Sequence, residues 1–234
     1  MSLGAVDLRR SFPTEASLRQ VPPESKDREA WLLELVSGEE HWRKWLEHPA
    51  SELLHHDGTC CAAARSWLLA YARSMEISTL GNCETRAPAW ISQRWEWGPS
   101  PWPMAWCELV KREVLDCGVF AVLAREIFRA QGISAHPAQA LLHYEEACTQ
   151  HWKQLWATDP RATFPWVGKR MVYHELCVLE LPDGTARFYD STWGQWYHPE
   201  PRAGHGAILA LRSECPRLLK WGGKTFQHGD WVKL

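Results

Sequence analysis

Apolar residues recur at helical spacing after Asp116, at positions 120, 123, 124, 127 and 128, and form one stripe. Asp116 is a favourable helix N-cap residue, and Gly132 suits the turn that ends a helix. We therefore expect a helix that starts directly after Asp116 and ends before Gly132, with Cys117 in its first turn. Similar spacing predicts two further helices upstream, over residues 28–47 and 60–75.

A different pattern further along the chain predicts a β-hairpin. Apolar residues flank the sequence Pro182-Asp183-Gly184, which suits a type I turn followed by a left-handed glycine. In the register of this loop Leu181 faces Thr185, and the numbers of paired residues sum to 366. His174 and Asp190 then share one face as diagonal neighbours, about 7–8 Å apart, a span that a side-chain hydrogen bond can bridge.

The hairpin face that carries His174 is also apolar. It holds Leu176, Val178 and Phe188, and we expect it to receive the helix that begins at Cys117. The predicted fold class is therefore α+β, with this helix packed on an antiparallel sheet and additional helices ahead of it.

The chain is expected to form one folded domain with an appendage. Residues 1–27 mix proline with polar residues without periodicity, which is typical of a flexible arm. No change of composition marks a linker after this arm, so residues 28–234 are predicted to be a single domain. Within it we expect a helical and tryptophan-rich part (28–113), a core of helix and hairpin (114–193) and a C-terminal β element (194–234).

The charge of the chain is nearly balanced, with a formal net charge of -2. Nucleic acids and anionic membrane surfaces bind proteins with a basic excess on one face, so we expect neither as a partner. The sequence lacks both a run of about 18 apolar residues and the apolar core of a secretion signal. We therefore expect a cytoplasmic protein. Its oligomeric state has no signature in the sequence.

The chain carries eight cysteines, and in a reducing compartment these are better interpreted as free thiols than as a disulfide framework. One cluster resembles half of a metal site: His55, His56 and Asp57 are followed by Cys60 and Cys61. A second half at zinc-site spacing is missing, so the favoured interpretation is a helix start followed by buried small residues. We expect no metal and no other cofactor.

Cys117 differs from the other cysteines because it lies in the first turn of a predicted helix. The unpaired N–H groups and the helix dipole at this end favour anions, which predicts a lowered pKa for the thiol and donors for an oxyanion. A nucleophilic thiol also needs a base. His174 and Asp190 supply a base and a group that orients it, the arrangement of covalent acyl-transfer catalysis.

The segments "DCGVFAVLAREIFRAQGISAHP" and "YHELCVLELPDGTARFYDST" carry cysteine, histidine and aspartate in this order. Residues 114–193 thereby resemble the transglutaminase-like superfamily, whose core has a cysteine at a helix start, a Gly-Ile-Pro-Ala stretch, a histidine-led strand and an aspartate on the next strand. The resemblance implies a papain-like fold with Cys117 as nucleophile, His174 as general base and acid, and Asp190 as the residue that orients the imidazole.

The chain departs from the superfamily pattern at several positions around these residues. Ser134 and Ser191 replace prolines, His136 replaces an arginine, and Glu175 and Leu176 replace an alanine and a tryptophan. None of these changes removes a group of the triad, but they separate the chain from typical protein-crosslinking members. The substrate is therefore not implied by the resemblance.

Tryptophan is unusually frequent, with 16 residues in the chain and five between positions 83 and 106. Prolines in the same stretch predict a rigid aromatic loop. Trp102 and Trp106 closely precede Cys117, and an indole N–H can donate to an oxyanion. Both are candidates to complete an oxyanion hole, and the alternative is that they line the cleft or fill the core.

Three functions are compatible with these residues. The first is a cysteine-dependent acyltransferase, which forms an acyl-thioester on Cys117 and passes the acyl group to an amine. Its acyl substrate would be a small molecule, a peptide or a group bound to a carrier protein. The second is a peptidase or amidase that hydrolyses an amide through the same acyl-enzyme. The third is a non-catalytic binding module that retains the fold.

Overall fold

The computed structural model describes residues 49–56, 58–74, 91, 93–100, 103–143, 150, 154, 171–199 and 207–234. The predicted arm (1–27), the predicted helix over 28–47 and Trp102 lie outside these residues. The described part combines helices with an antiparallel six-stranded sheet, which confirms the predicted α+β class. None of the helices within it is both long and apolar enough to cross a bilayer.

The described helices are α3 (Thr59–Ser74), α6 (Trp106–Leu109) and α7 (Cys117–Ala130). The strands are β1 (Glu96–Trp97), β2 (Val114–Leu115), β3 (Ala135–His143), β4 (Met171–Glu180), β5 (Ala186–Asp190), β6 (Gln195–Trp196), β7 (Ala207–Ser213), β8 (Leu219–Trp221), β9 (Lys224–Phe226) and β10 (Trp231–Lys233). The main sheet has the order β10-β7-β3-β4-β5-β6, and all its neighbouring strands are antiparallel. α3 confirms the helix predicted over residues 60–75.

The ends of α7 lie where the sequence predicts them. The Asp116 carboxylate caps the helix by accepting a hydrogen bond from the Val119 N–H at 3.1 Å. At the other end Gly132 has a φ of 79°, a left-handed conformation that glycine adopts without steric cost. Cys117 is therefore the first residue of the helix, as expected.

The predicted hairpin and its register are confirmed. The Leu181 N–H donates to the Thr185 carbonyl at 2.9 Å, and the Gly184 N–H donates to the Leu181 carbonyl at 2.9 Å. Gly184 has a φ of 78°, as a left-handed turn position requires. Val178 pairs with Phe188, so the strands have the register predicted from the turn.

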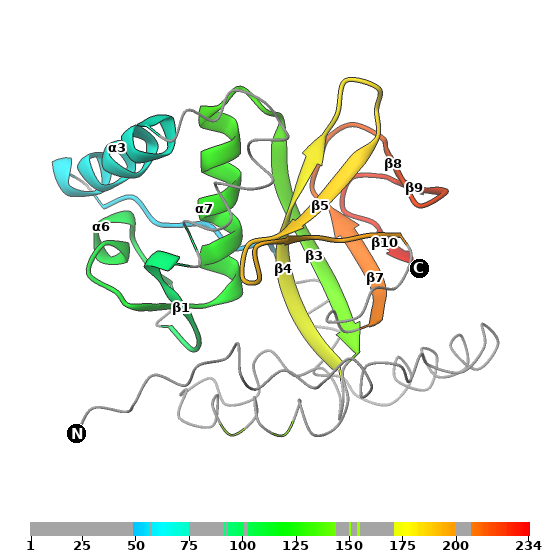
Figure 1. Cartoon of the computed structure of the whole chain (residues 1–234), viewed down its shortest axis with the longest axis horizontal. Coiled ribbons are helices and arrows are strands. Elements are labelled where there is room, and N and C mark those ends of the chain that lie inside the picture. Colours follow the sequence, from blue (N-terminus) through cyan, green and yellow to red (C-terminus); the bar gives the residue numbers. More distant parts are fainter. Residues whose placement is uncertain are drawn as a thin grey trace.

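α7 packs on the hairpin face opposite to the predicted one. The apolar core around this helix contains Cys177, Leu179 and Tyr189. The Phe128 ring on α7 meets the Tyr189 ring edge-on, with 5.4 Å between the centroids. Figure 1 shows α7 on one side of β3 and β4, and the β8–β9 hairpin on the other.

The residues predicted to receive α7, which include Val178 and Phe188, belong to a second core cluster. There the Phe188 ring lies 5.3 Å from the rings of Trp221 and Phe226 on the β8–β9 hairpin. The predicted face was wrong because this hairpin supplies a second apolar layer, so both faces of β4 are buried. A strand that is apolar on both faces does not indicate which face a helix covers.

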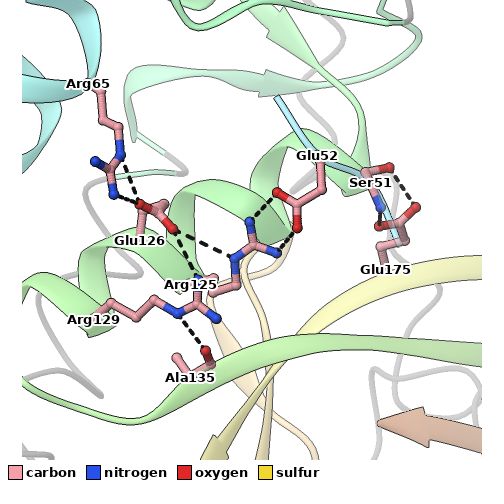
Figure 2. A network of polar contacts seen from close by, with 8 residues as sticks. All are labelled: Ser51, Glu52, Arg65, Arg125, Glu126, Arg129, Ala135 and Glu175. Carbon is pink, nitrogen blue, oxygen red and sulfur yellow. Dashed lines mark hydrogen bonds and ion pairs between the residues drawn. The ribbon is translucent and has the colours of Figure 1, made fainter. Parts of the chain in front are cut away.

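A network of ion pairs and hydrogen bonds holds α7 to the segments around it (Figure 2). The buried Arg125 guanidinium binds the Glu52 carboxylate through two nitrogens, one of them at 2.7 Å. The neighbouring Glu126 accepts hydrogen bonds from two nitrogens of Arg65 on α3, from Nη2 at 2.5 Å and from Nε at 3.0 Å. Paired charges of this kind position side chains by geometry as well as by attraction. The network thereby ties α7 to α3 and to the segment around Glu52.

Candidate active site

The structure brings the predicted histidine and aspartate into direct contact. His174 Nε2 lies 2.9 Å from Asp190 Oδ2, and both side chains are buried. The carboxylate also accepts hydrogen bonds from the Thr192 N–H at 3.0 Å and the Tyr197 hydroxyl at 3.1 Å. With these three partners Asp190 is fixed in position and holds the imidazole in one orientation.

Cys117 meets His174 from the start of α7. Cys117 is only 2% exposed, and the pKa of the thiol and the pKa of the imidazole each depend on the other group. Strand alternation would place His174 on the face away from α7. However, the ladder between β4 and β5 ends at the pair Cys177 and Tyr189. β5 therefore does not pair with β4 alongside His174, and the imidazole interacts with Cys117 at the start of α7.

The expected lowering of the Cys117 pKa is not found. Burial raises the pKa of the Cys117 thiol, His174 lowers it by a smaller amount, and the charges of Asp116 and Glu175 raise it further. The helix N-terminus offers less stabilisation to the thiolate than predicted because the Asp116 carboxylate already binds the Val119 N–H. Without a bound substrate, the surroundings of Cys117 therefore favour the neutral thiol.

The pKa of His174 shifts upward, to about 10. Burial alone lowers this pKa, but the charge of Asp190, the hydrogen bond to it and the interaction with Cys117 together outweigh burial. At neutral pH the resting pair is thus a thiol beside an imidazolium. The reactive pair, either thiol with imidazole or thiolate with imidazolium, has one proton fewer.

A buried polar network surrounds the residue next to His174. The Glu175 carboxylate accepts hydrogen bonds from the Ser51 N–H at 2.8 Å, the Ser51 hydroxyl at 2.7 Å and the Tyr173 hydroxyl at 3.2 Å. Tyr173 in turn accepts a hydrogen bond from the Gln139 amide at 2.6 Å. Burial raises the pKa of Glu175 to about 7, against the lowering effect of the bonds from Ser51. Figure 2 shows how Ser51 faces Glu175.

The close approach of Ser51 to α7 requires glycine at position 118. A Cβ atom at Gly118 would lie 2.3 Å from the Ser51 hydroxyl oxygen and 2.8 Å from its Cβ. Both distances are shorter than real contacts allow. The first turn of α7, the Ser51 segment and Glu175 therefore form one tightly packed unit beside Cys117.

Two backbone N–H groups at the start of α7 remain suitable for an oxyanion. The Val119 N–H binds the Asp116 carboxylate and the Phe120 N–H binds the Asp116 carbonyl, so both are occupied. The N–H groups of Cys117 and Gly118 lie in the first turn of α7, where no helical carbonyl four residues earlier can accept their hydrogen bonds. These two amides are the donors closest along the chain to the reacting sulfur.

The predicted roles of the tryptophans stay predictions. Trp102 lies outside the described residues. Trp106 is buried at the start of α6, in the core cluster around α7, and its ring centroid lies 6.2 Å from that of His55. Among the described residues, no hydrogen bond or ring contact brings Trp106 to Cys117 or His174, so its position agrees with the alternative role in the core.

Two groups of potential metal ligands occur in the described part of the chain. His136, Glu180 and Cys215 form one, but Glu180 already binds Ser134 at 2.9 Å and Arg217 at 2.9 Å. This group is explained by its own hydrogen bonds and ion pair. The other group lies at the start of α3. It consists of three cysteines and one histidine and shares no residue with the Cys117 site.

No protein-family model matches the chain, and a search of curated proteins finds no match. Its function is therefore inferred from the chemistry of the residues around Cys117.

The sequence predicted that His174 contacts Asp190, which the structure confirms, and it did not predict the nearby roles of Glu175, Tyr197 and Ser51. One signal was present for Glu175, because a carboxylate inside an otherwise apolar strand needs a buried partner. No local pattern pointed to Ser51 or Tyr197. They reach the site from segments that only the tertiary fold brings near.

The contact between Gly118 and Ser51 is testable by a double-mutant cycle. We expect Gly118→Ala to destabilise the protein by about 1–3 kcal/mol, because the new methyl group overpacks against Ser51. In a Ser51→Gly background the same change should be neutral or stabilising, since alanine is favoured over glycine in a helix by up to about 1 kcal/mol. Urea denaturation measures both. Equal costs in the two backgrounds would contradict the contact.

The raised pKa of His174 predicts a specific dependence of stability on pH. The folded protein binds this proton more tightly than the unfolded chain, so its contribution is complete below the unfolded value of about 6.5 and is lost as the pH rises through about 10. The stability difference between the native protein and His174→Gln should therefore shrink from pH 6 to pH 10, as measured by denaturation at each pH.

His136 provides the matched control for this measurement. Its pKa is lowered, first by burial and then by Arg129, so protonation of His136 opposes folding. The His136→Gln variant should gain stability relative to the native protein as the pH falls below about 6.5. If the stability difference between the native protein and His174→Gln grows as the pH rises, as is expected for His136→Gln, the raised pKa of His174 is refuted.

Proposed function

We propose that this protein is a cysteine-dependent acyl-transfer enzyme with Cys117 as nucleophile, His174 as general base and acid, and Asp190 as the group that orients the imidazole. The observation that carries the proposal is the buried His174–Asp190 hydrogen bond of 2.9 Å next to a thiol at a helix start. A nucleophile, a base and a third group that orients the base are the parts this chemistry needs.

The papain and transglutaminase-like architecture belongs to the same proposal. It is supported by α7 packed on an antiparallel sheet, by histidine on β4 and by aspartate at the end of β5. The six cysteines of the described residues are free thiols, which agrees with a reducing, cytoplasmic location.

The proposed reaction has two steps. Neutral His174 accepts the thiol proton while the Cys117 sulfur attacks a carbonyl carbon, and the amides of Cys117 and Gly118 are positioned to stabilise the oxyanion. The intermediate collapses by expelling the leaving group, to which the His174 imidazolium returns the proton. An acyl-thioester then remains on Cys117. An amine attacks it, His174 removes the amine proton, and the amide product leaves as the thiol re-forms.

Burial of the site favours transfer to an amine over hydrolysis. With Cys117 2% and His174 4% exposed, bulk water has little access to the thioester. An amine that binds in the site can replace water as the acceptor. Hydrolysis by the same acyl-enzyme is the alternative, and a non-catalytic binding module would have no need for the fixed His174 imidazole.

Selective alkylation tests the nucleophile. We expect iodoacetamide to modify Cys117 faster than Cys177 in the native protein, as measured by mass spectrometry of peptides from a time course. Cys177 is the matched control, because it is equally buried next to α7, has a pKa raised to about 12 by burial and lacks a histidine base. The His174→Ala variant should slow the labelling of Cys117 by about 100-fold, the usual scale of a general base.

The proposal also predicts how the rate of Cys117 alkylation depends on pH. Because the resting pair must lose a proton to react, the labelling rate of Cys117 should rise from pH 7 to pH 10. A rate that is already maximal at pH 6, or one that His174→Ala leaves unchanged, would sink the catalytic assignment.

The acyl acceptor is identified by a second experiment. Incubation with acyl thioesters of N-acetylcysteamine should add an acyl group to Cys117 and release N-acetylcysteamine, with no adduct on Cys117→Ala. Intact-protein mass spectrometry follows the adduct. We expect added amines to discharge it as amides and water alone to discharge it slowly. Rapid loss in water without amine would favour a hydrolase, and the absence of any adduct would favour a binding module.

A further inference from the structure

Four potential metal ligands meet at the start of α3. They are His56, Cys60, Cys61 and Cys107, and their ligand atoms all lie within 4.8 Å of one another. His56 ends the segment ahead of the helix, Cys60 and Cys61 lie in its first turn, and Cys107 lies on α6. The group is distinct from the Cys117 site in both its residues and its position.

Cys107 supplies the half of the site that the sequence lacks. His56 and the Cys60-Cys61 pair are close in sequence, whereas Cys107 follows 46 positions after Cys61. Local spacing therefore gave no indication of a fourth ligand, and the sequence-based interpretation favoured buried small residues. The fold contradicts that interpretation for Cys60, which is exposed, and agrees with it for Cys61, which is buried; Cys107 is partly exposed.

The distances suit a single tetrahedral ion. His56 Nδ1 lies 3.6 Å from Cys107 Sγ. In a tetrahedral zinc site, with Zn–S of about 2.3 Å and Zn–N of about 2.0–2.1 Å, nitrogen and sulfur ligands are about 3.6 Å apart. One pair of ligand atoms is thus already at the spacing of a zinc site, and all four lie within 4.8 Å of one another, so the rearrangement needed for binding is small.

We propose that His56, Cys60, Cys61 and Cys107 bind a structural Zn²⁺ ion. Three thiolates and one imidazole are a common zinc ligand set, and soft sulfur donors select zinc over the hard cations Mg²⁺ and Ca²⁺. Four protein ligands fill a tetrahedral shell and leave no position for substrate, so the ion stabilises the fold. On binding, the three thiols release their protons to solvent and form three Zn–S bonds, and the neutral imidazole forms the fourth bond through Nδ1.

The backbone around the site is already arranged to support these ligands. The His56 N–H points at Cys61 Sγ at 3.3 Å, a contact that would stabilise a thiolate. The ligand-bearing segments are also joined directly. The Leu54 N–H donates to the Met104 carbonyl at 2.9 Å, and the Trp106 N–H donates to the Leu54 carbonyl at 3.1 Å. These bonds place His56 and Cys107 next to each other without the ion.

The amount of zinc bound by the purified protein tests the proposal directly. Protein purified under reducing conditions and loaded with Zn²⁺ should retain about one equivalent after gel filtration, determined by mass spectrometry of the metal. Loading with Co²⁺ should produce the visible absorption and thiolate charge-transfer bands of a tetrahedral cobalt site. Cys60→Ser should abolish both signals. Cys60 is exposed, so this change alters the ligand set without disturbing the core.

Two controls separate this site from the other thiols. Cys117→Ala removes the proposed nucleophile and Cys215→Ala removes the cysteine beside His136, and both variants should keep the full metal content. Loss of zinc in either variant would place the ion elsewhere and overturn the proposal. So would the absence of bound metal in reduced native protein, or a disulfide between Cys107 and Cys60 or Cys61 in freshly purified protein.

A stability measurement tests the structural role. Removal of zinc with 1,10-phenanthroline should lower the thermal midpoint of the native protein and leave that of Cys60→Ser unchanged, because ligand binding to the folded state stabilises it. If the native midpoint is insensitive to the chelator while zinc is lost, the ion has no structural role.

Discussion

The buried hydrogen bonds between Ser51 and Glu175 hold together the segments that meet at Cys117. A carboxylate inside the protein is tolerated only where donors satisfy it, and Ser51 supplies two of them. To do so, Ser51 must lie against the first turn of α7, which glycine at position 118 permits. The position of α7 on β4 therefore depends on the polar contact between Ser51 and Glu175 as well as on the apolar core between the helix and the sheet. Because Cys117 precedes Gly118 and His174 precedes Glu175, this contact also sets the distance between the thiol and the imidazole.

The charges near the sulfur give the site its protonation state. The charges of Asp116 and Glu175 raise the pKa of Cys117, and the charge of Asp190 raises the pKa of His174, so the environment favours protons on both groups. A helix start with its dipole unopposed would favour the thiolate, but here the capping carboxylate occupies that end and burial removes the water that would solvate a free anion. The pair is consequently at rest as thiol and imidazolium. In the proposed reaction this pair loses one proton before the sulfur attacks.

The parts of the structure that local chemistry determines could be predicted from the sequence. Asp116 and Gly132 mark the ends of α7, and the turn at residues 182–184 sets the register that places His174 and Asp190 on one face of the hairpin. The face on which α7 packs could not be predicted, because both faces of β4 are apolar and the β8–β9 hairpin that covers one of them lies far along the chain. The prediction that the pKa of Cys117 is lowered was wrong for a related reason. A cap and a helix start are visible in sequence, but burial and the nearby Glu175 charge are products of the tertiary fold.

The segment from Ser51 to His56 connects the two sites. At one end Ser51 and Glu52 bind Glu175 and Arg125, and at the other end His56 reaches the cysteine cluster. The free energy of metal binding to a structural site is also free energy of folding, so an ion at the cluster would restrict the motion of this short segment. Ser51 lies five positions before the ligand His56, so the restriction would act close to the residues around Cys117. Occupancy of the proposed zinc site and the geometry at Cys117 are thus expected to be coupled through the backbone, although no side chain is shared between them.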